Sequence, residues 1–392
     1  MNQESEIARL QEQLKVNPND SKILNALIFR LLREGRTSEA IPFIDRALDI
    51  DATDIATLWH ASVAALHTGQ LEKALKLLYE LVRLKPDHHE ARDKIRFLHG
   101  RLIEPWHFAM LNDHERNAVF EAAIKAAVKP GVVVVEVGTG SGLLSMMAAR
   151  AGAEHVYTIE KSFALYNAAK QIIERNGLSN KITVLNCWSS GVQVGRDIPV
   201  KADLLIAEIL GSAILDEQIV HFLNDARDRL LKPGGIVIPQ RAVLVGALLE
   251  SKSLRERFRV DTVSGFNLSL FNALYQQPSL QVDLSQFDFK LLSQPFEIFD
   301  FDFQKTLPST RENRFSVKLE ADGVCHGIAR WIRLFADSSH VMESKPQYSR
   351  SHWQQTVEIF EEPVSLRSGS QVEVRAAQLP DRVFVRLSPP VK

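Results

Sequence analysis

The residues from Val132 to Glu160 read "VVVVEVGTGSGLLSMMAARAGAEHVYTIE". The apolar runs at both ends are typical of buried parallel strands, and the segment between them has the period of an amphipathic helix. Gly138, Gly140 and Gly142 join the first strand to that helix, and glycine there lets a ligand approach the backbone and the helix N-terminus. Glu160 ends the second strand, where a carboxylate can accept both hydroxyls of a ribose. The stretch therefore predicts a parallel sheet with a nucleoside site at its carboxyl edge.

The spacing of these glycines narrows the choice of cofactor. Their GxGxG pattern is a poor match to the GxGxxG fingerprint of dinucleotide-binding folds, because the third glycine comes one residue early. The loop also lacks a basic residue that could bind a phosphate. Ribose recognition without a phosphate contact favours S-adenosylmethionine as the cofactor. The alternative interpretation is a glycine-rich turn that packs closely and binds no ligand.

Strand-like and helix-like patterns alternate along this part of the chain. Helical stretches separate three further apolar strands, Lys181–Asn186, Ala202–Glu208 and Gly234–Pro239. Such alternation predicts a doubly wound, Rossmann-like α/β domain, which we place at residues 101–240. After Pro239 the pattern changes to short alternating strands. These predict an antiparallel β domain, a barrel or a sandwich, over residues 241–392.

The first hundred residues repeat with a period of 34. Gly35 corresponds to Gly69 and Ala40 to Ala74. A glycine at the turn between two amphipathic helices, and an alanine where the helices pack, are typical of tetratricopeptide repeats. We therefore expect an all-α repeat domain over residues 1–100 that docks another protein. A generic pair of helical hairpins is the alternative.

Composition excludes several classes of protein. A chain of 392 residues is long enough for more than one domain, and its 47 basic and 48 acidic residues leave a net charge of −1. That balance gives no electrostatic footprint for nucleic-acid binding. Cys187 and Cys325 lie far apart, which argues against a disulfide framework and a zinc site. The polar N-terminus and the lack of a long apolar run argue against a secretory signal and a membrane span. We expect a cytoplasmic protein without a metal site.

The segment Ala207–Glu217, "AEILGSAILDE", places two glutamates nine residues apart around a glycine-containing loop. Glu208 ends a buried strand beside the expected cofactor site, and a buried carboxylate needs a partner. Singly, Glu208 could be an ordinary strand-end residue and Glu217 a solvated helix residue. As a pair, they can bind the planar guanidinium group, which offers five donors. One terminal nitrogen of the bound guanidinium would then face a methyl donor.

Four segments together resemble the protein arginine methyltransferases. They are the cofactor stretch Val134–Ser162, the double-glutamate loop, "SHWQQTV" at Ser351–Val357 and "WHFAMLNDHERN" at Trp106–Asn117. The resemblance extends from about Glu104 to the C-terminus, and it is best to the branch with N-terminal tetratricopeptide repeats and the related branch of tandem modules. It implies methyl transfer from S-adenosylmethionine to a guanidinium nitrogen of arginine in a protein substrate.

The resemblance also implies roles for individual residues. The catalytic residues would be Glu208, Glu217, His352 and Asp113. The substrate-binding residues would be Glu208, Glu217, Trp353 and Met110. The cofactor-binding residues would be Arg116, Glu136, Gly138, Gly140, Gly142, Glu160, Ser189, Ser190 and His107. Within these sets, Arg116 would pair with the carboxylate of the cofactor, Glu160 would hold its ribose, and His352 would face Asp113.

Residues 258–291 form a segment rich in Phe and Leu that lacks sustained helix or strand periodicity. Apolar surface on such a long irregular insertion needs to be covered. In the resembled family an arm from this part of the chain docks on a second subunit, so we expect a homodimer. The alternative is that the segment folds back onto its own β domain.

Two other functions remain open at this stage. One is S-adenosylmethionine-dependent methyl transfer to another protein residue or to a small molecule. The other is a tetratricopeptide scaffold with a degenerate methyltransferase domain, against which the intact glycines and glutamates argue. The bulky residues that the family has after the first loop glutamate are replaced by Ile209, Leu210 and Ser212, so the sequence leaves the degree of methylation open.

Overall fold

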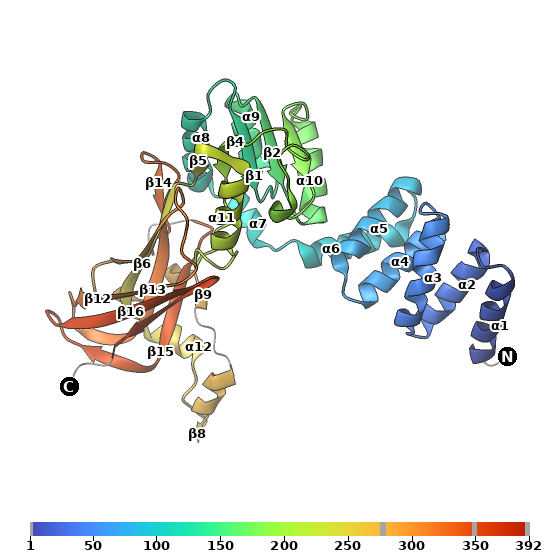
Figure 1. Ribbon diagram of the computed structural model, residues 1–392. Coiled ribbons are helices and arrows are strands. Elements are labelled where there is room, and N and C mark those ends of the chain that lie inside the picture. Colours follow the sequence, from blue (N-terminus) through green and yellow to red (C-terminus); the bar gives the residue numbers. More distant parts are fainter. Residues whose placement is uncertain (1–2, 275–279, 347–350, 389–392) are drawn as a thin grey trace. The chain divides into compact units, whose positions relative to one another are not determined.

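The structure is a computed structural model that describes residues 3–274, 280–346 and 351–388 (Figure 1). The chain divides into two compact units. The first unit extends to Pro105 and also includes Ser162–Ala168. The second contains Trp106–Lys161 and the chain from Ala169 onward. Each unit is described by itself.

The first unit is a stack of antiparallel helix pairs. Its helices are α1 (Gln3–Val16), α2 (Ser21–Arg33), α3 (Thr37–Ile50), α4 (Ile55–His67), α5 (Leu71–Leu84) and α6 (His89–Leu102). Gly35 and Gly69 follow α2 and α4 with φ of 73° and 72°, a left-handed conformation that glycine adopts without a steric cost. Ala40 and Ala74 are fully buried where the helices meet. The predicted tetratricopeptide-like hairpins are therefore confirmed.

The beginning of α10 (Phe163–Arg175) belongs to this helical unit. The carboxylate of Glu72 on α5 accepts the N–H of Phe163 and the hydroxyl of Ser162, both at 3.0 Å. A carboxylate at this place satisfies a donor that the helix leaves unpaired and complements the helix dipole. The ring of Phe163 also packs edge-on against Tyr79, with 5.5 Å between the ring centroids.

The second unit begins with a five-stranded parallel sheet, the predicted doubly wound core. Its strands are β1 (Val133–Val137), β2 (His155–Ile159), β3 (Ile182–Leu185), β4 (Ala202–Ile206) and β5 (Leu231–Ile238). Their order is β3-β2-β1-β4-β5, with all neighbours parallel. The helices of this part are α7 (Trp106–Leu111), α8 (His114–Ala127), α9 (Leu143–Arg150), the rest of α10, and α11 (Ile219–Leu230). The strand order reverses between β1 and β4, which is where open α/β sheets bind their ligands.

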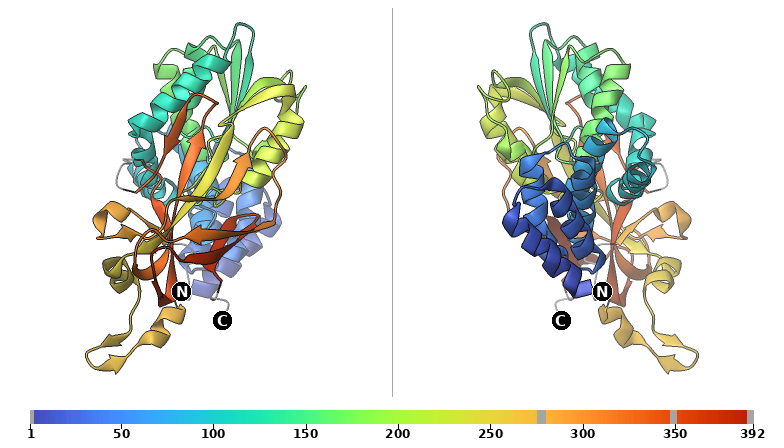
Figure 2. Two further views of the ribbon diagram at one scale, coloured as in Figure 1. Left: turned by 90° about the vertical axis from the view of Figure 1, so that its left-hand side faces the viewer. Right: turned by 90° about the vertical axis from the view of Figure 1, so that its right-hand side faces the viewer.

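The C-terminal part of this unit is antiparallel, as the alternating pattern predicts. In the larger sheet, five strands have the order β10-β6-β13-β15-β9. In addition, β11 pairs with β6, and β14 pairs with β13. A separate sheet has the order β12-β16-β17. The bounds in the larger sheet are β6 (Arg241–Glu250), β9 (Leu280–Val282), β10 (Lys290–Leu291), β11 (Phe296–Asp302), β13 (Gly323–Phe335), β14 (Val341–Glu343) and β15 (Gln355–Leu366). Those in the smaller sheet are β12 (Arg311–Lys318), β16 (Gln371–Leu379) and β17 (Arg382–Leu387). Figures 1 and 2 show these sheets below the parallel sheet of the same unit.

The pairings among the described strands do not close a barrel, so the barrel alternative of the prediction is not confirmed. The physical reason lies at β17, whose backbone is bound by side chains of the larger sheet. Arg330 Nη1 donates to the carbonyl of Val383 at 2.7 Å, and the carboxylate of Glu358 accepts the N–H of Val385 at 2.9 Å. Arg330 is only 1% exposed. These two side chains thus satisfy backbone groups that a paired strand would otherwise bind.

The predicted arm, residues 258–291, follows α12 (Lys252–Phe258), and its residues 275–279 lie outside the described ranges. Its short elements are β7 (Thr262–Val263), β8 (Phe266–Asn267), η2 (Ser269–Leu274), β9, η3 (Leu284–Gln286) and β10. Figure 1 shows the segment around β8 projecting from the β domain. Its apolar side chains are largely exposed: Phe266 71%, Leu270 87%, Phe271 63% and Leu274 78%.

Across the described ranges, we find no helix with the length and apolar character that a membrane crossing requires.

Candidate active site

The glycine loop after β1 is packed directly against the double-glutamate loop. Gly138 has a φ of 88°, and a Cβ built there would lie 2.8 Å from Cγ2 of Ile209, the residue after Glu208. A side chain at this position would displace Ile209 in addition to straining the backbone. The N–H of Gly140 donates to Glu160 at 3.0 Å. Through these two contacts, the loop after β1 packs against the residues that follow β2 and β4.

Glu136 lies beneath this loop and is 2% exposed. Its carboxylate accepts hydrogen bonds from the hydroxyls of Ser145 and, at 2.8 Å, Thr158. Burial raises the pKa of Glu136 to about 7, although these hydrogen bonds and the charge of Arg116 act in the opposite direction. The side chain thus joins β1 to α9 and β2 and supports the loop. Direct contact of Glu136 with the cofactor stays a prediction.

Arg116 extends from the first turn of α8 into the same region. Asp113 caps this helix by accepting the N–H of Arg116 at 3.0 Å. The Arg116 guanidinium is 5.1 Å from the ring centroid of Phe120, and it donates to Glu208. The resemblance implied that Arg116 would pair with the carboxylate of the cofactor. In this structure it forms a buried ion pair with Glu208, since both side chains are at most 5% exposed and buried opposite charges need each other.

The residues around Arg116 fit S-adenosylmethionine, which carries an amino-acid carboxylate and a ribose. Within the described residues, Nε of Arg116 is buried and has no hydrogen-bond partner, so it can donate to a carboxylate. Glu160 lies at the carboxyl end of β2 beside Gly140, where it can accept ribose hydroxyls. A Cβ built on Gly140 would meet no atom within 4 Å. The loop therefore offers both the space and the polar groups that this cofactor requires.

The loop between Glu208 and Glu217 has a strained backbone. Ile214 is fully buried and has a φ of 69°, a left-handed conformation that is rare for a β-branched residue. A Cβ on Gly211 would overlap the carboxylate of Asp216, so this side chain lies directly against the backbone of the loop. Strain of this kind persists only where surrounding contacts hold it in place. These contacts return the chain so that Glu217 comes near Glu208.

The two glutamates are close enough to influence each other's charge. Desolvation and the negative charges of Glu208 and Asp216 raise the pKa of Glu217 to about 7, while Lys161 lowers it. Glu217 as a whole residue is exposed, so its burial is partial, and the negative charges of Glu208 and Asp216 add to the effect of burial on its pKa. Such a pair of carboxylates strongly favours a bound cation. A guanidinium could bridge them through parallel N–H···O bonds.

The β domain holds this loop and helix α8 in place. His352 contacts Asp113 with both its backbone N–H and its Nδ1, each at 3.0 Å. Burial alone would raise the pKa of Asp113, but the hydrogen bonds from His352 and from the N–H of Arg116 bring it down to about 2. The indole N–H of Trp353 donates to the carbonyl of Leu210 at 2.7 Å. Trp353 is 2% exposed, so it anchors the loop, and its contact with substrate stays a prediction.

For the remaining predicted residues, the contacts that the structure describes assign no role. His107 stacks on Trp106, with 3.8 Å between the ring centroids, and Met110 is half-buried on the same helix, α7. Ser189 and Ser190 form η1 (Ser189–Gly191) after β3. Ser189 is buried, and its carbonyl accepts a hydrogen bond from Arg229 at 2.8 Å. Their contacts with substrate or cofactor stay predictions.

Several supporting residues were missed from the sequence. Gln281 on β9 donates to the hydroxyl of Ser212 at 2.9 Å and so binds the double-glutamate loop from the β domain. Lys161 lies 4.6 Å from the ring centroid of Trp188, which is 53% exposed. Gly211 alone gave a usable signal, because a glycine inside a loop indicates a close approach. The other contacts join residues far apart in sequence.

Comparisons with known proteins agree with this geometry. The family profile described as "Ribosomal protein L11 methyltransferase" matches residues 113–244, and that of the "Arginine methyltransferase oligomerization subdomain" matches residues 240–387. A tetratricopeptide-repeat profile matches residues 31–95. The chain has the fold of a Trypanosoma brucei PRMT1 enzyme–prozyme complex solved with AdoHcy, at a TM-score of 0.62 and 23% identity, over 73% of this chain and 94% of that one.

Proteins with similar sequences identify the family. An arginine N(omega)-methyltransferase of Streptomyces achromogenes subsp. streptozoticus is 34% identical over 70% of this chain and 76% of its own length. Protein arginine N-methyltransferase 9 of Xenopus laevis is 28% identical over 82% of this chain. The chain spans only 43% of that longer protein. Together with the glycine loop and the paired glutamates, these similarities show that the chain belongs to the protein arginine methyltransferase family.

Proposed function

We propose that this chain transfers a methyl group from S-adenosylmethionine to a guanidinium nitrogen of arginine in a protein substrate. The observation that carries the proposal is the pair of carboxylates, Glu208 and Glu217, in a strained loop that packs against the glycine loop of the cofactor site. A guanidinium fits this pair in charge and in shape. The helical repeats supply a surface suited to docking a protein.

In this proposal, the cofactor supplies an electrophilic methyl group on its sulfonium. Arg116, Gly140 and Glu160 hold and orient that cofactor. Glu208 and Glu217 bind the substrate guanidinium and leave one terminal nitrogen uncovered, so that rate comes mainly from positioning and electrostatics. The nitrogen that gains a methyl group must lose a proton. Glu217 is suited to accept this proton, because it binds the same guanidinium, and in the site without substrate its pKa of about 7 lies near the working pH.

His352 acts in this proposal by positioning. Its ring and backbone bind Asp113, and Asp113 in turn caps the helix that carries Arg116. The contact therefore couples the β domain to the residue that pairs with Glu208. A direct part in relaying the proton stays a prediction for His352, whose side chain is 6% exposed.

The closest alternative is methyl transfer to a small molecule, since the name of the Streptomyces relative specifies arginine and not a protein. Labelled cofactor should be incubated with an arginine-rich peptide, the same peptide with lysine in place of arginine, and free arginine. The proposal predicts label on the arginine peptide, with mass spectrometry placing the added methyl on the guanidinium. Labelling of free arginine alone would favour the alternative, and labelling of neither would leave the scaffold interpretation.

We also propose that the arm makes a homodimer. Support comes from the exposed side chains of Phe266, Leu270, Phe271 and Leu274, which together form an apolar patch that needs a partner surface. The match of residues 240–387 to the oligomerization subdomain agrees with this. Light scattering should give twice 44.1 kDa, and Phe266→Asp with Phe271→Asp should give the monomer and lower the activity. A fully active wild-type monomer would contradict the proposal.

We also propose a reducing compartment for this protein, most simply the cytoplasm. Cys187 and Cys325 are both free thiols in the described structure. Burial raises the pKa of Cys325 to about 11, so this thiol is inert at neutral pH. Fractionation of the producing cells, followed by immunodetection, would test the location.

A further inference from the structure

A row of arginines crosses the small sheet of the β domain, outside the proposed active site. Arg314 on β12 is directly opposite Arg375 on β16, and Arg375 is directly opposite Arg386 on β17. In antiparallel sheets, directly opposite residues point to the same face, and neighbouring strands lie about 4.8 Å apart. All three side chains are exposed. Like charges in such positions destabilise a sheet, so the row costs stability to the extent that other charges do not compensate it.

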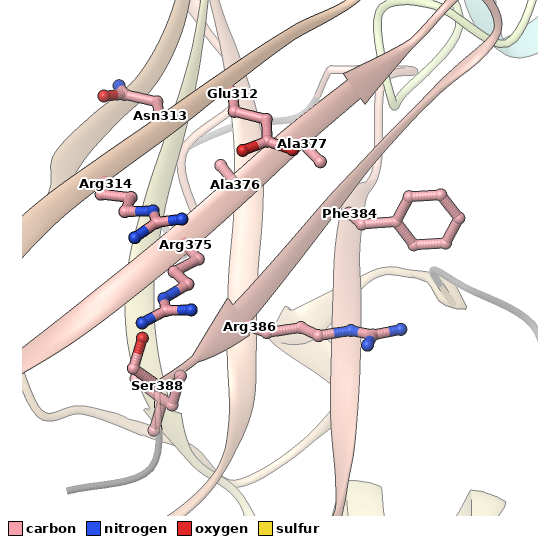
Figure 3. A pocket seen from close by; sticks show the side chains of 10 residues that line it. Glu312, Asn313, Arg314, Arg375, Ala376, Ala377, Phe384, Arg386 and Ser388 are labelled. Atoms are coloured by element: carbon pink, nitrogen blue, oxygen red, sulfur yellow. The ribbon is translucent and has the colours of Figure 1, made fainter. Parts of the chain in front are cut away.

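The arginines line an open groove with a cavity volume of about 500 Å³ (Figure 3). In this view Arg314 and Arg375 lie over β12 and β16, whereas Arg386 extends from β17 away from them. The positive charge is therefore spread along the groove and not concentrated at one point. Phe384 and Ala377 also line the groove and add apolar surface between the charged groups. An extended ligand with several anionic groups fits this arrangement better than a single small anion does.

Intramolecular pairing neutralises only part of this charge. Arg375 donates to Glu373 at 2.7 Å, and Glu373 also accepts the hydroxyl of Ser388. Within the ranges that the structure describes, neither Arg314 nor Arg386 has a carboxylate at ion-pair distance. Two guanidinium groups of the row therefore remain able to form bidentate contacts with carboxylates of a ligand.

The acidic residues of the same face restrict the class of ligand. Glu312 lines the groove, one row from the arginines, and Glu373 lies one row beyond them on the other side. They would repel a continuous polyanion such as a nucleic-acid backbone, whereas separated carboxylates on an extended peptide can avoid them. The net charge of −1 gives no long-range attraction for nucleic acid either. We propose that this arginine groove binds an acidic peptide segment of a partner protein.

Fluorescence anisotropy on the full chain tests the proposal. The probe is a labelled peptide of alternating Glu and Gly, with a Gln–Gly peptide as the uncharged comparison and a labelled oligouridylate as the nucleic acid. The groove variant carries Arg314→Gln and Arg386→Gln, which leaves the Arg375–Glu373 pair intact. The control variant carries Arg257→Gln and Arg382→Gln, two exposed arginines outside the groove.

The acidic peptide should bind the wild type and the control variant, and the groove variant should bind it at least about tenfold more weakly. Binding should also weaken with added salt. Thermal denaturation should show the groove variant no less stable than the control, because the like-charge pair of Arg314 and Arg375 is relieved. The proposal is overturned if wild type does not bind the acidic peptide, if both variants bind it equally, or if oligouridylate binds more tightly. Methylation of a short arginine peptide should be unchanged in the groove variant, so this test is independent of the proposed catalytic function.

Discussion

The raised pKa of Glu217 predicts how the activity depends on pH. In our proposal, Glu208 and Glu217 form a clamp for a guanidinium, which stays charged at every usable pH, so both carboxylates must be ionised. Glu217 has a pKa of about 7 instead of its ordinary value of 4.5, and it therefore becomes protonated as the pH falls through 7. The value of kcat/KM, which reports the free enzyme, should be half-maximal near pH 7 and fall about tenfold for each further unit.

Replacing Lys161 tests whether nearby charges set the pKa of Glu217. Lys161 lowers the pKa of Glu217, so Lys161→Met should raise it and move the acidic limb to higher pH. Each unit of this shift reduces kcat/KM at pH 6 about tenfold more, while the plateau at high pH is retained. Lys170→Met, which removes an exposed lysine from α10, is the matched control and should leave the limb in place.

The assay is the initial rate of methyl transfer to an arginine peptide below its KM, measured from about pH 5.5 to 9. Cofactor affinity is measured across the same range, so that a loss of cofactor binding is not mistaken for protonation of the clamp. A kcat/KM that stays constant down to about pH 5.5 would refute the reasoning. So would a limb that Lys161→Met moves to lower pH.

Three further predictions concern the supports of the site. Trp353→Phe leaves the carbonyl of Leu210 without its donor, at a cost of about 1–3 kcal/mol, so initial rates should fall about 5–150-fold with unchanged calorimetric cofactor affinity; an unchanged rate would contradict this. Gly138→Ala strains the backbone and forces Ile209 aside, so cofactor affinity, turnover and thermal stability should all decrease, the last by about 1–3 kcal/mol; an unaltered melting temperature and Kd would contradict it. Glu160→Ala should weaken cofactor binding by about 1.5–3 kcal/mol in calorimetry, and equal affinity would remove Glu160 from the site.

The sequence predicts the parallel sheet well because its strands are continuous apolar runs. Val133–Val137 and Ala202–Ile206 are buried on both faces, and few other structures bury so many branched residues in sequence. The helical hairpins are equally easy to predict, because Gly35 and Gly69 mark the turns between helices. In both cases the determining pattern is local.

The arrangement of the β domain is harder to predict from the sequence, because it depends on contacts between residues that are distant in the chain. The alternating pattern predicts strands but not their partners, and the sequence gives no sign that Arg330 and Glu358 bind the backbone of β17. A buried arginine looks like a surface residue until its partners are known. Barrel and sandwich therefore could not be distinguished beforehand.

In the candidate site too, local features could be predicted from the sequence and long-range contacts could not. The nine-residue spacing of Glu208 and Glu217 indicates a pair, because both lie in one loop. The ion pair from Arg116 to Glu208 spans 92 residues, and the contact from Trp353 to Leu210 spans 143. Such long-range pairs follow from the strand order and from the docking of the β domain, neither of which a local pattern specifies.

Methyl transfer by variants of the two glutamates tests the proposed clamp most directly. Glu208→Gln and Glu217→Gln retain the shape of the side chains but each remove one charge, and Glu174→Gln on the exposed end of α10 is the matched control. Turnover of an arginine peptide should be measured beside cofactor affinity. The proposed clamp predicts that each loop variant loses at least about 100-fold in kcat/KM, equivalent to about 2.7 kcal/mol, while still binding the cofactor. Turnover within about tenfold of the wild type by either variant would contradict it.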